Sequence, residues 1–319
     1  MSELEHIATI VTQELAAFEQ EYAKQMHSSV ELANNVGKYI TRHKGKLIRP
    51  LLTMLSAGAS NGTVDDHIVH MAVALELLHN SSLIHDDVVD NSNLRRGMPT
   101  INSYLGNKVA VLCGDLYLAK VMSLLYAHAN TAEMAVINRT AIEMSEGELL
   151  QQQTCRITNL DESNYIVTID KKTASLMAAC CEIGSISKNN TDYTKRLKVF
   201  GVHYGRAFQM HDDMLDYMPM ANTGKPYGND IQEKKITLPL LCFLRQTSES
   251  RRESIMNMLH QNTIDEITAT QIVAEVADSE ALLEVQKHID IESALALEQL
   301  SKLPPSKYKN GLQAMIQLL

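Results

Sequence analysis

The stretch from residue 64 to residue 91 is apolar on almost every side, and it restricts the fold more than any other part of the chain. Met71, Val73, Leu75, Leu77 and Leu78 crowd together there, so no single helical face carries the apolar residues. A helix of this kind is typical of a position surrounded by other helices. The sequence therefore predicts a helical bundle with this segment at its centre.

Helical periodicity continues through most of the 319 residues. Only 14 glycines and 7 prolines interrupt it, and we find no internal repeat and no β-hairpin signal. We expect an all-α fold, and a single domain over residues 1–319 because no change in composition divides the chain. The expected helices span about 2–25, 28–42, 47 onward, 64–91, 107–129, 131–156, 162–187 and 192–218, with several shorter helices in 237–319.

Charge and cysteine content exclude several classes of protein. The formal net charge of −9 argues against a nucleic-acid partner, which would favour a basic surface. The five cysteines form no C-x-x-C pair, so we expect reduced thiols in a cytoplasmic protein. The first residues carry acids where a signal peptide needs bases. No run of about 18 uncharged apolar residues occurs, so no transmembrane segment is expected.

Two aspartate clusters of the form D-D-x-x-D carry the chemistry. They consist of Asp86, Asp87 and Asp90, and of Asp212, Asp213 and Asp216. The first and last aspartates of each cluster lie four residues apart and share one helical face. A solvated acidic face is the ordinary interpretation of such a run. Both clusters lie within apolar segments, however, where ionised carboxylates need a partner.

Divalent cations are the natural partners for these carboxylates. Mg²⁺ prefers oxygen ligands, keeps several waters and commonly bridges to a substrate phosphate. Two such faces opposed across a cavity would hold several metal ions around a diphosphate. The sequence therefore predicts metal binding at both clusters.

Basic residues accompany the aspartates. Arg95 and Arg96 follow the first cluster, and guanidinium groups suit bidentate phosphate contacts. Lys46 and Arg49 lie near a predicted helix start, where backbone N–H groups favour anions. Three further lysines lie in a predicted helix, in the Gly- and Pro-containing loop 221–230 and shortly after that loop: Lys172, Lys225 and Lys235. A loop that carries lysines could close over a phosphate.

His79 lies seven residues before Asp86 and should share its face. A lone histidine is usually structural, but this one could donate to a second diphosphate. Glu76 and His79 also match the Glu-x-x-His pattern of di-iron bundles. That alternative needs a second pair, and the other candidate in the sequence is Glu3 with His6, at the chain end.

Taken together, the motifs resemble the trans-polyprenyl diphosphate synthases. The resemblance rests on GKLIRP, HNSSLIHDDVVDNSNLRRGMPT, GD at 114–115, EGELLQ, KTASL, FQMHDDMLD and GKPYGNDIQEKKITLPL, in the family's order over residues 45–240. It implies a bundle of long antiparallel helices around a deep central cavity, usually dimeric. It also implies Mg²⁺-dependent head-to-tail condensation of isopentenyl diphosphate with an allylic diphosphate such as farnesyl or geranylgeranyl diphosphate.

The resemblance also implies roles for individual residues. About three Mg²⁺ ions per site would be held by Asp86, Asp87, Asp90, Asp212 and Asp216. The allylic diphosphate would contact Arg95, Lys172, Lys235 and, from the loop, Lys225. Isopentenyl diphosphate would contact Lys46, Arg49, His79 and Arg96. Thr173 and Gln209 would line the site of the allylic cation.

Product length should follow from the volume of the cavity. Ser81 and Ser82 lie one turn before the first cluster, where short-chain members of the family commonly carry a bulky aromatic residue. The small pair predicts a medium or long chain, about six to eight isoprene units or more, since each buried CH₂ group favours elongation. Met122, Leu125 and Met144 are candidates for the cavity floor.

Several alternatives remain open. A short-chain farnesyl or geranylgeranyl synthase is disfavoured by Ser81 and Ser82. A terpene cyclase is disfavoured because its second metal motif would be of the Asn/Asp-Ser/Thr-Glu type. An inactive partner subunit would usually lack the aspartates, whereas an active homodimer or a need for a small partner subunit is compatible with the sequence. The chain also departs from the family, because it ends in MIQLL rather than a basic tail, and Asn91 and Asn93 replace frequent acids.

Overall fold

The computed structural model describes residues 2–154, 160–186, 191–218, 228–259 and 264–319. The N-terminal half contains α1 (Glu3–Ala8), η1 (Thr9–Val11), α2 (Thr12–Met26), α3 (Glu31–Arg42), α4 (Ile48–Asn61), α5 (Asp66–Val89), β1 (Leu94–Arg95), β2 (Met98–Pro99), α6 (Ile101–Leu105), α7 (Asn107–His128) and α8 (Thr131–Thr154). The C-terminal half contains α9 (Glu162–Ile169), η2 (Asp170–Ala174), α10 (Ser175–Ile186), α11 (Thr191–Leu215), α12 (Asn229–Gln232), α13 (Leu238–Gln246), α14 (Glu249–Leu259), α15 (Glu266–Ala277), α16 (Ala281–Ser301) and α17 (Lys307–Ile316).

The centre of the bundle is α5, as the sequence predicts. Every residue from Met71 to Leu78 is buried, and α5 packs against α2, α4, α7 and α10. The helix begins where the Asp65 side chain accepts a hydrogen bond from the Ile68 N–H at 3.1 Å. It ends at Val89, so the first aspartate cluster occupies its last turn. The predicted all-α class is confirmed.

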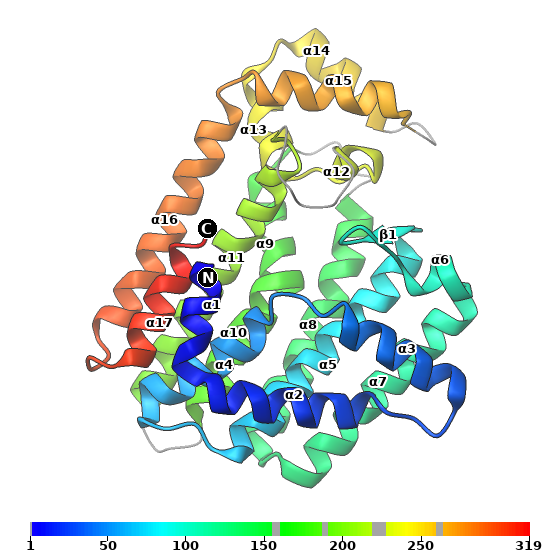
Figure 1. Cartoon of the computed structure of the whole chain (residues 1–319). Coiled ribbons are helices and arrows are strands. Elements are labelled where there is room, and N and C mark those ends of the chain that lie inside the picture. Colours follow the sequence, from blue (N-terminus) through cyan, green and yellow to red (C-terminus); the bar gives the residue numbers. More distant parts are fainter. Residues whose placement is uncertain (1, 155–159, 187–190, 219–227, 260–263) are drawn as a thin grey trace.

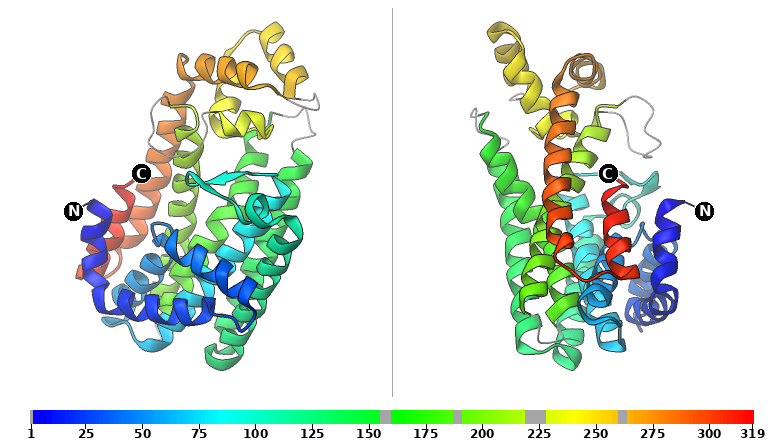
Figure 2. Two further views of the ribbon diagram at one scale, coloured as in Figure 1. Left: turned by 45° about the vertical axis from the view of Figure 1, so that its right-hand side comes forward. Right: turned by 90° about the vertical axis from the view of Figure 1, so that its left-hand side faces the viewer.

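Long helices run alongside one another and shorter ones cross their ends. Figure 1 shows α2 and α3 across the front of the lower end, and α14 and α15 across the upper end. The second view in Figure 2 again places α14 and α15 at that end, and shows α16 alongside α11. The two described ends of the chain lie near each other, because α1 packs against α17.

Two apolar cores stabilise the arrangement. The larger one is formed mainly by α4, α5, α7 and α10. The smaller one joins α13, α15 and α16 to the end of α11, with Met210, Met214 and Tyr217 buried in it. The second core therefore holds the turn of α11 that carries the second aspartate cluster.

Three local features differ from the sequence predictions. The expected helix 2–25 is divided into α1, η1 and α2, with Val11 at φ −131° before α2. The expected helix 162–187 contains η2, a π-helical turn. A small antiparallel pair, β1 with β2, contradicts the absence of a hairpin, and its turn has positive φ at Arg96 (54°) and Gly97 (73°). Gly97 favours that conformation, but arginine is uncommon in it, so the sequence signal for the turn was weak.

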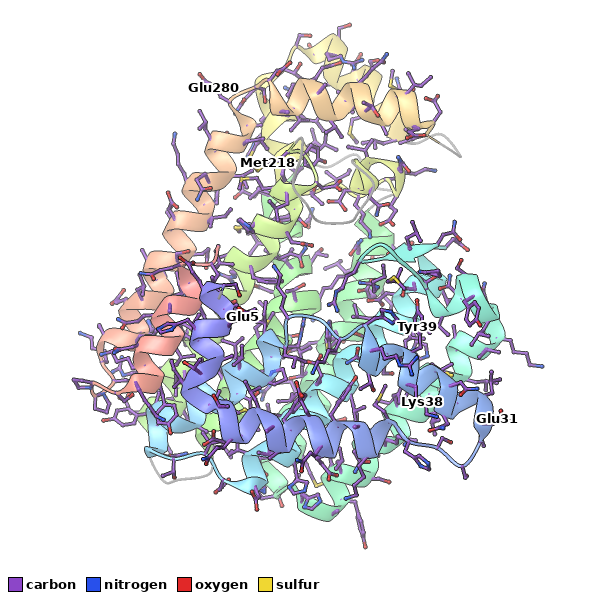
Figure 3. All side chains as sticks on the ribbon, in the orientation of Figure 1. Glu5, Glu31, Lys38, Tyr39, Met218 and Glu280 are labelled. Atoms are coloured by element: carbon purple, nitrogen blue, oxygen red, sulfur yellow. The ribbon has the colours of Figure 1, made fainter. Side chains whose placement is uncertain are left out.

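Tyr39 secures this hairpin to α3. Its hydroxyl donates a hydrogen bond to the Pro99 carbonyl at 2.7 Å, and Figure 3 labels its position on α3. The hairpin is thereby held beside the last turn of α5. It carries Arg95 and Arg96, so its placement directs both guanidinium groups.

One helix among the described residues, α7, is long and apolar enough to cross a membrane by length and composition alone. Its inner face is packed against α5, with Ala110, Cys113, Tyr117 and Val121 buried. Core helices of soluble proteins pass the same test, so this single helix is weak evidence for a span.

Candidate active site

The first aspartate cluster is divided by the structure into two roles. Asp86 and Asp90 lie one turn apart, and the Asp90 N–H donates to the Asp86 carbonyl at 2.8 Å. Asp87 is buried and is paired with Arg95, whose Nε and Nη2 lie 2.9 and 2.8 Å from its Oδ1. Arg95 is thereby fixed beside the cluster.

Asp86 lies in an environment that opposes its ionisation. Burial, and then the nearby Glu148 carboxylate, raise the pKa of Asp86 to about 7. Lys172 and Arg95 act against this rise in pKa. Lys172 is placed to do so, because its Nζ lies 2.6 Å from Glu148 Oε1 and donates to Gln151 Oε1 at 3.0 Å. A carboxylate with this raised pKa is better stabilised by a further cation.

The second cluster lies at the end of α11 and is also divided. Asp213 is buried and accepts hydrogen bonds from the Tyr165 hydroxyl and from Gln209 Nε2, both at 2.7 Å. Gln209 Oε1 in turn accepts from Thr173 Oγ1 at 2.6 Å. This chain of bonds connects α9, η2 and α11, and it places Thr173 and Gln209 together as the sequence predicts.

Asp216 holds the segment that comes after the second cluster. Its Oδ2 and Oδ1 accept hydrogen bonds from the backbone N–H groups of Asp230 at 2.9 Å and Asn229 at 3.3 Å. These two groups belong to the first residues of α12, whose N-terminus favours a carboxylate. Asp216 therefore orients α12 toward the end of α11.

Lys235 connects the two ends of the site. Its Nζ donates to Asp90 Oδ2 at 3.0 Å, across 145 residues of sequence, and also pairs with Glu233. These carboxylates, with Asp230, raise the pKa of Lys235 despite its burial. Lys234 has a positive φ of 61°, so the backbone turns sharply just before this lysine. Lys225, the other lysine predicted for this loop, lies outside the described residues.

A second group of cations lies beside the aspartates. Leu47 adopts a left-handed conformation (φ 51°) before α4, between Lys46 and Arg49. A Cβ added to Gly45 would lie 2.4 Å from the Arg96 guanidinium, so that guanidinium lies directly against the backbone of Gly45. The GKLIRP segment and the hairpin therefore meet at this point.

The buried cationic side chains of this group are incompletely compensated, as a binding site for a polar ligand would be. Arg49 Nε is buried and has no hydrogen-bond partner among the described residues. Burial lowers the pKa of Arg49, which Glu76 opposes. Burial first, and then the charges of Arg49, Arg95 and Arg96, lower the pKa of His79 well below its ordinary value. Such an arrangement suits an anion, because an anion would relieve both the desolvation and the mutual repulsion.

The predicted chain-length residues face different directions. Ser81 is buried, and its hydroxyl donates to the Gly114 carbonyl on α7 at 2.8 Å. The Ser82 hydroxyl bonds to its own helix, at the His79 carbonyl. A Cβ on Gly114 would lie 2.1 Å from the His85 ring, so the His85 imidazole occupies the space that a side chain at position 114 would fill.

Of the three residues predicted for the floor of the cavity, two are buried and one is exposed. Met122 is 58% exposed, so its placement at the floor of an internal cavity was wrong. Leu125 and Met144 are buried. Sequence reasoning missed Tyr117, which is fully buried one turn after Gly114 and has a hydroxyl without a partner among the described residues.

The donor chemistry fits a hard cation, although within the described ranges no three His, Cys, Asp or Glu side chains are arranged as a complete metal site. Asp86 and Asp90 offer carboxylate oxygens on one face, and a metal together with substrate oxygens would complete the ligand set. The Glu76 and His79 pair has no second pair beside it in the described part of the chain, which argues against the di-iron alternative.

Comparisons with known proteins agree with this geometry. Residues 30–276 match the family Polyprenyl synthetase. The all-trans-nonaprenyl-diphosphate synthase (geranyl-diphosphate specific) of Rhodobacter capsulatus is 35% identical over 97% of this chain and 94% of its own length. The heptaprenyl diphosphate synthase component 2 of Geobacillus stearothermophilus is 30% identical over 97% of this chain and 96% of its own length.

A solved structure gives the same result. The polyprenyl synthase from Caulobacter crescentus CB15, complexed with calcium and isoprenyl diphosphate, superposes with a TM-score of 0.94. It is 28% identical, over 98% of this chain and 96% of that one. The chain therefore belongs to the polyprenyl synthetase family. It is a prenyltransferase of the medium- to long-chain class, as its sequence predicts.

Proposed function

We propose that this protein lengthens an allylic diphosphate by repeated addition of isopentenyl diphosphate, with Mg²⁺, to an all-trans chain of about six to eight isoprene units or more. The observation that carries the proposal is the convergence of three cations on the first aspartate cluster, one of them from the segment that follows the second cluster. Lys235 reaches Asp90 from beyond α11, while Lys172 and Arg95 lie beside Asp86 and Asp87.

The aspartates would hold the metal ions. Asp86 and Asp90 share a face, and the raised pKa of Asp86 indicates that a cation is needed to keep that face ionised. Asp87, Asp212 and Asp216 would complete the set, for about three Mg²⁺ ions. The bound ions would supply positive charge that stabilises the departing diphosphate. The solved relative from Caulobacter crescentus, complexed with calcium and isoprenyl diphosphate, supports a divalent cation here.

The side chains of this chain would place two diphosphates next to each other. Arg95, Lys172 and Lys235, with Lys225, would bind the allylic diphosphate. Lys46, Arg49, His79 and Arg96 would bind isopentenyl diphosphate, since buried Arg49 Nε has no hydrogen-bond partner among the described residues and the Arg96 charge acts as far as Asp212.

In the reaction, the allylic C–O bond breaks and its electron pair leaves with the diphosphate. The double bond of isopentenyl diphosphate then forms a C–C bond to the allylic cation, and a proton is lost to the released diphosphate. Thr173 Oγ1 and Gln209 would face the cation and exclude water. Holding both substrates in this geometry accounts for a large part of the rate enhancement.

Chain length is supported by the small residues at the end of α5. Ser81 and Ser82 leave space that an aromatic pair would fill. The printed names of the relatives, nonaprenyl and heptaprenyl synthases, indicate products of that length for those proteins. A farnesyl or geranylgeranyl synthase is the less supported alternative. A quinone side chain is the product class that such lengths serve.

A homodimer would form through α7 and α8. Their outer faces expose large apolar side chains, including Leu112, Met122, Tyr126 and Ile142, at 51–92% exposure. Covering such a surface favours association. We expect Met122→Glu to shift the sedimentation-equilibrium mass from dimer to monomer. The control Ile267→Glu, on the exposed side of α15, should leave the mass unchanged.

A small partner subunit is an alternative for activity, because the name "component 2" of the Geobacillus stearothermophilus relative indicates a second component for that protein. We also propose a cytoplasmic location, which the buried free thiols of the four described cysteines support.

The direct test is product analysis of the purified chain alone. It is incubated with Mg²⁺, farnesyl diphosphate and labelled isopentenyl diphosphate, and the dephosphorylated products are sized. A ladder that ends at six to eight units or beyond supports the proposal. Products that stop at three or four units would contradict the chain length, and an absence of elongation would favour an obligate partner.

A further inference from the structure

The π-helical turn η2 brings Lys172 and Thr173 to the site. The Ser175 N–H donates to the Asp170 carbonyl five residues earlier, where an α-helix would bond residues four apart. One extra residue in the turn rotates α10 by about 100° relative to α9, since an α-helix has 3.6 residues per turn. The direction of Lys172 and Thr173 relative to α10 therefore depends on this turn being maintained.

Two neighbouring helices, α8 and α11, pack closely against η2. A Cβ on Gly147 of α8 would lie 2.7 Å from the Lys172 nitrogen, and one on Gly205 of α11 would lie 2.6 Å from the Ala174 Cα. Both helices thus approach the turn backbone to backbone. These contacts leave room for the turn but do not fix its register, because neither glycine bonds to it.

The first residue of η2 is bound by an ion pair that the proposed mechanism does not use. Arg206, next to Gly205, donates from Nε to Asp170 Oδ1 at 2.6 Å and from Nη2 to Asp170 Oδ2 at 2.7 Å. This bidentate geometry restricts both distance and orientation. Asp170 therefore accepts the π-type bond with its carbonyl and binds Arg206 with its carboxylate, at the first residue of η2.

Arg206 also has a purely structural contact, which allows the two roles to be separated. Its Nη1 donates to Glu292 Oε1 of α16 at 3.4 Å, and His203 Nδ1 lies 2.6 Å from Glu292 Oε2. Figure 3 labels Met218 and Glu280 at the upper ends of α11 and α16, the helices that this contact joins. Glu292 lies on α16 and has no proposed contact with metal or substrate, so this side of Arg206 should matter for packing alone.

We propose that Arg206 and Asp170 are positioning residues for the allylic diphosphate: their ion pair holds η2 in the register that directs Lys172 and Thr173 into the site. The inference rests on the proposed roles of Lys172 and Thr173. Gln209 lies three residues after Arg206 on α11 and accepts from Thr173, so one face of α11 binds both ends of the turn.

The test compares two isosteric variants on either side of Arg206. Asp170→Asn weakens the pair at η2, whereas Glu292→Gln weakens the pair at α16. Initial rates are measured with each substrate varied while the other is saturating. For Asp170→Asn we expect kcat/KM for the allylic diphosphate to fall about ten- to a hundredfold, as a misplacement near 1 Å does. The KM for isopentenyl diphosphate should stay within about twofold, because its proposed residues lie just before α4, on α4 and α5, and in the hairpin.

Further variants separate positioning from stability. Arg206→Gln should reproduce Asp170→Asn, and Arg206→Lys, which keeps the charge but not the fork, should recover part of the loss. Arg251→Gln removes an equally bidentate pair with Glu275 (2.9 and 2.6 Å) between α14 and α15, and should leave both KM values unchanged. The proposal would be overturned if Asp170→Asn had wild-type kinetics, or if its kcat/KM fell equally for both substrates. So would a Glu292→Gln variant that shows the same selective loss.

Lys172→Gln and Thr173→Val distinguish this inference from the site assignment. If they lower allylic kcat/KM while Asp170→Asn does not, the site stands and the positioning role is refuted. If neither variant changes allylic kinetics, the assignment of the two residues is itself wrong, and the positioning role falls with it.

Discussion

Replacing Ser81 with phenylalanine should convert the enzyme to a short-chain synthase. Ser81 lies five residues before Asp86 on one helix, or roughly 7.5 Å along the axis at 1.5 Å per residue. One isoprene unit adds four backbone C–C bonds, about 5 Å. At about 5 Å per unit, roughly 7.5 Å corresponds to about one and a half units, so a ring at position 81 would block the growing chain within its first few units.

The energetic effect of such a block is large. Each further isoprene unit buries five carbons, or roughly 4 kcal/mol at about 0.8 kcal/mol per carbon. Losing that burial makes it about a thousandfold less favourable, for each added unit, to hold the longer chain in the cavity, since 1.4 kcal/mol is a factor of ten. We expect the product ladder of Ser81→Phe to end sharply at three or four units.

The assay is the sizing of dephosphorylated products, with Ser81→Ala as the matched control. Alanine removes the hydrogen bond to Gly114 without adding bulk, so it should cost about 1 kcal/mol of stability and leave the ladder unchanged. Circular dichroism must show that Ser81→Phe retains its helical fold, because overpacking at a buried position costs about 1–3 kcal/mol. A folded Ser81→Phe enzyme with wild-type products would refute the placement of Ser81 on the elongation path.

Three further predictions concern charge and burial. Asp86→Asn should lose activity by at least about a thousandfold. In metal-free buffer at pH 8 it should nevertheless unfold at a higher temperature than the wild type, because a folded-state pKa raised to about 7 makes the ionised carboxylate destabilising at that pH. Equal melting temperatures would contradict this expectation. His79, with its folded-state pKa lowered, should make the wild-type protein less stable as pH falls below about 6.5, by up to about 1.4 kcal/mol per pH unit, because the unfolded chain takes up the proton first. Urea titrations between pH 7.5 and 5.5 should show a shallower decline for His79→Gln. Tyr165→Phe should cost about 1–3 kcal/mol in the same titrations, because buried Asp213 loses a donor, and an unchanged midpoint would argue against that bond.

The helical class and the aspartate clusters could be predicted from the sequence because both are local signals. The periodicity of residues 64–91 indicates neighbours on all sides, and two D-D-x-x-D runs inside apolar segments indicate a polar or cationic partner for the carboxylates. The fold class and the family membership that these signals indicate are confirmed. The single-domain organisation and the roles of individual residues stay predictions.

Only the tertiary structure decided which charged groups meet. Asp87 pairs with Arg95, which lies on a hairpin whose two-residue turn needs an unusual arginine conformation. Asp213 accepts a hydrogen bond from Tyr165, which is 48 residues away in the sequence. The π-helical turn and the ion pair between Arg206 and Asp170 could likewise not be predicted from the sequence. One inserted residue barely alters a 3.6-residue period, and an ion pair between distant helices leaves no trace in local sequence. Patterns in sequence determine which face of a helix is buried, whereas the partner of each buried charge is determined by how the helices pack together.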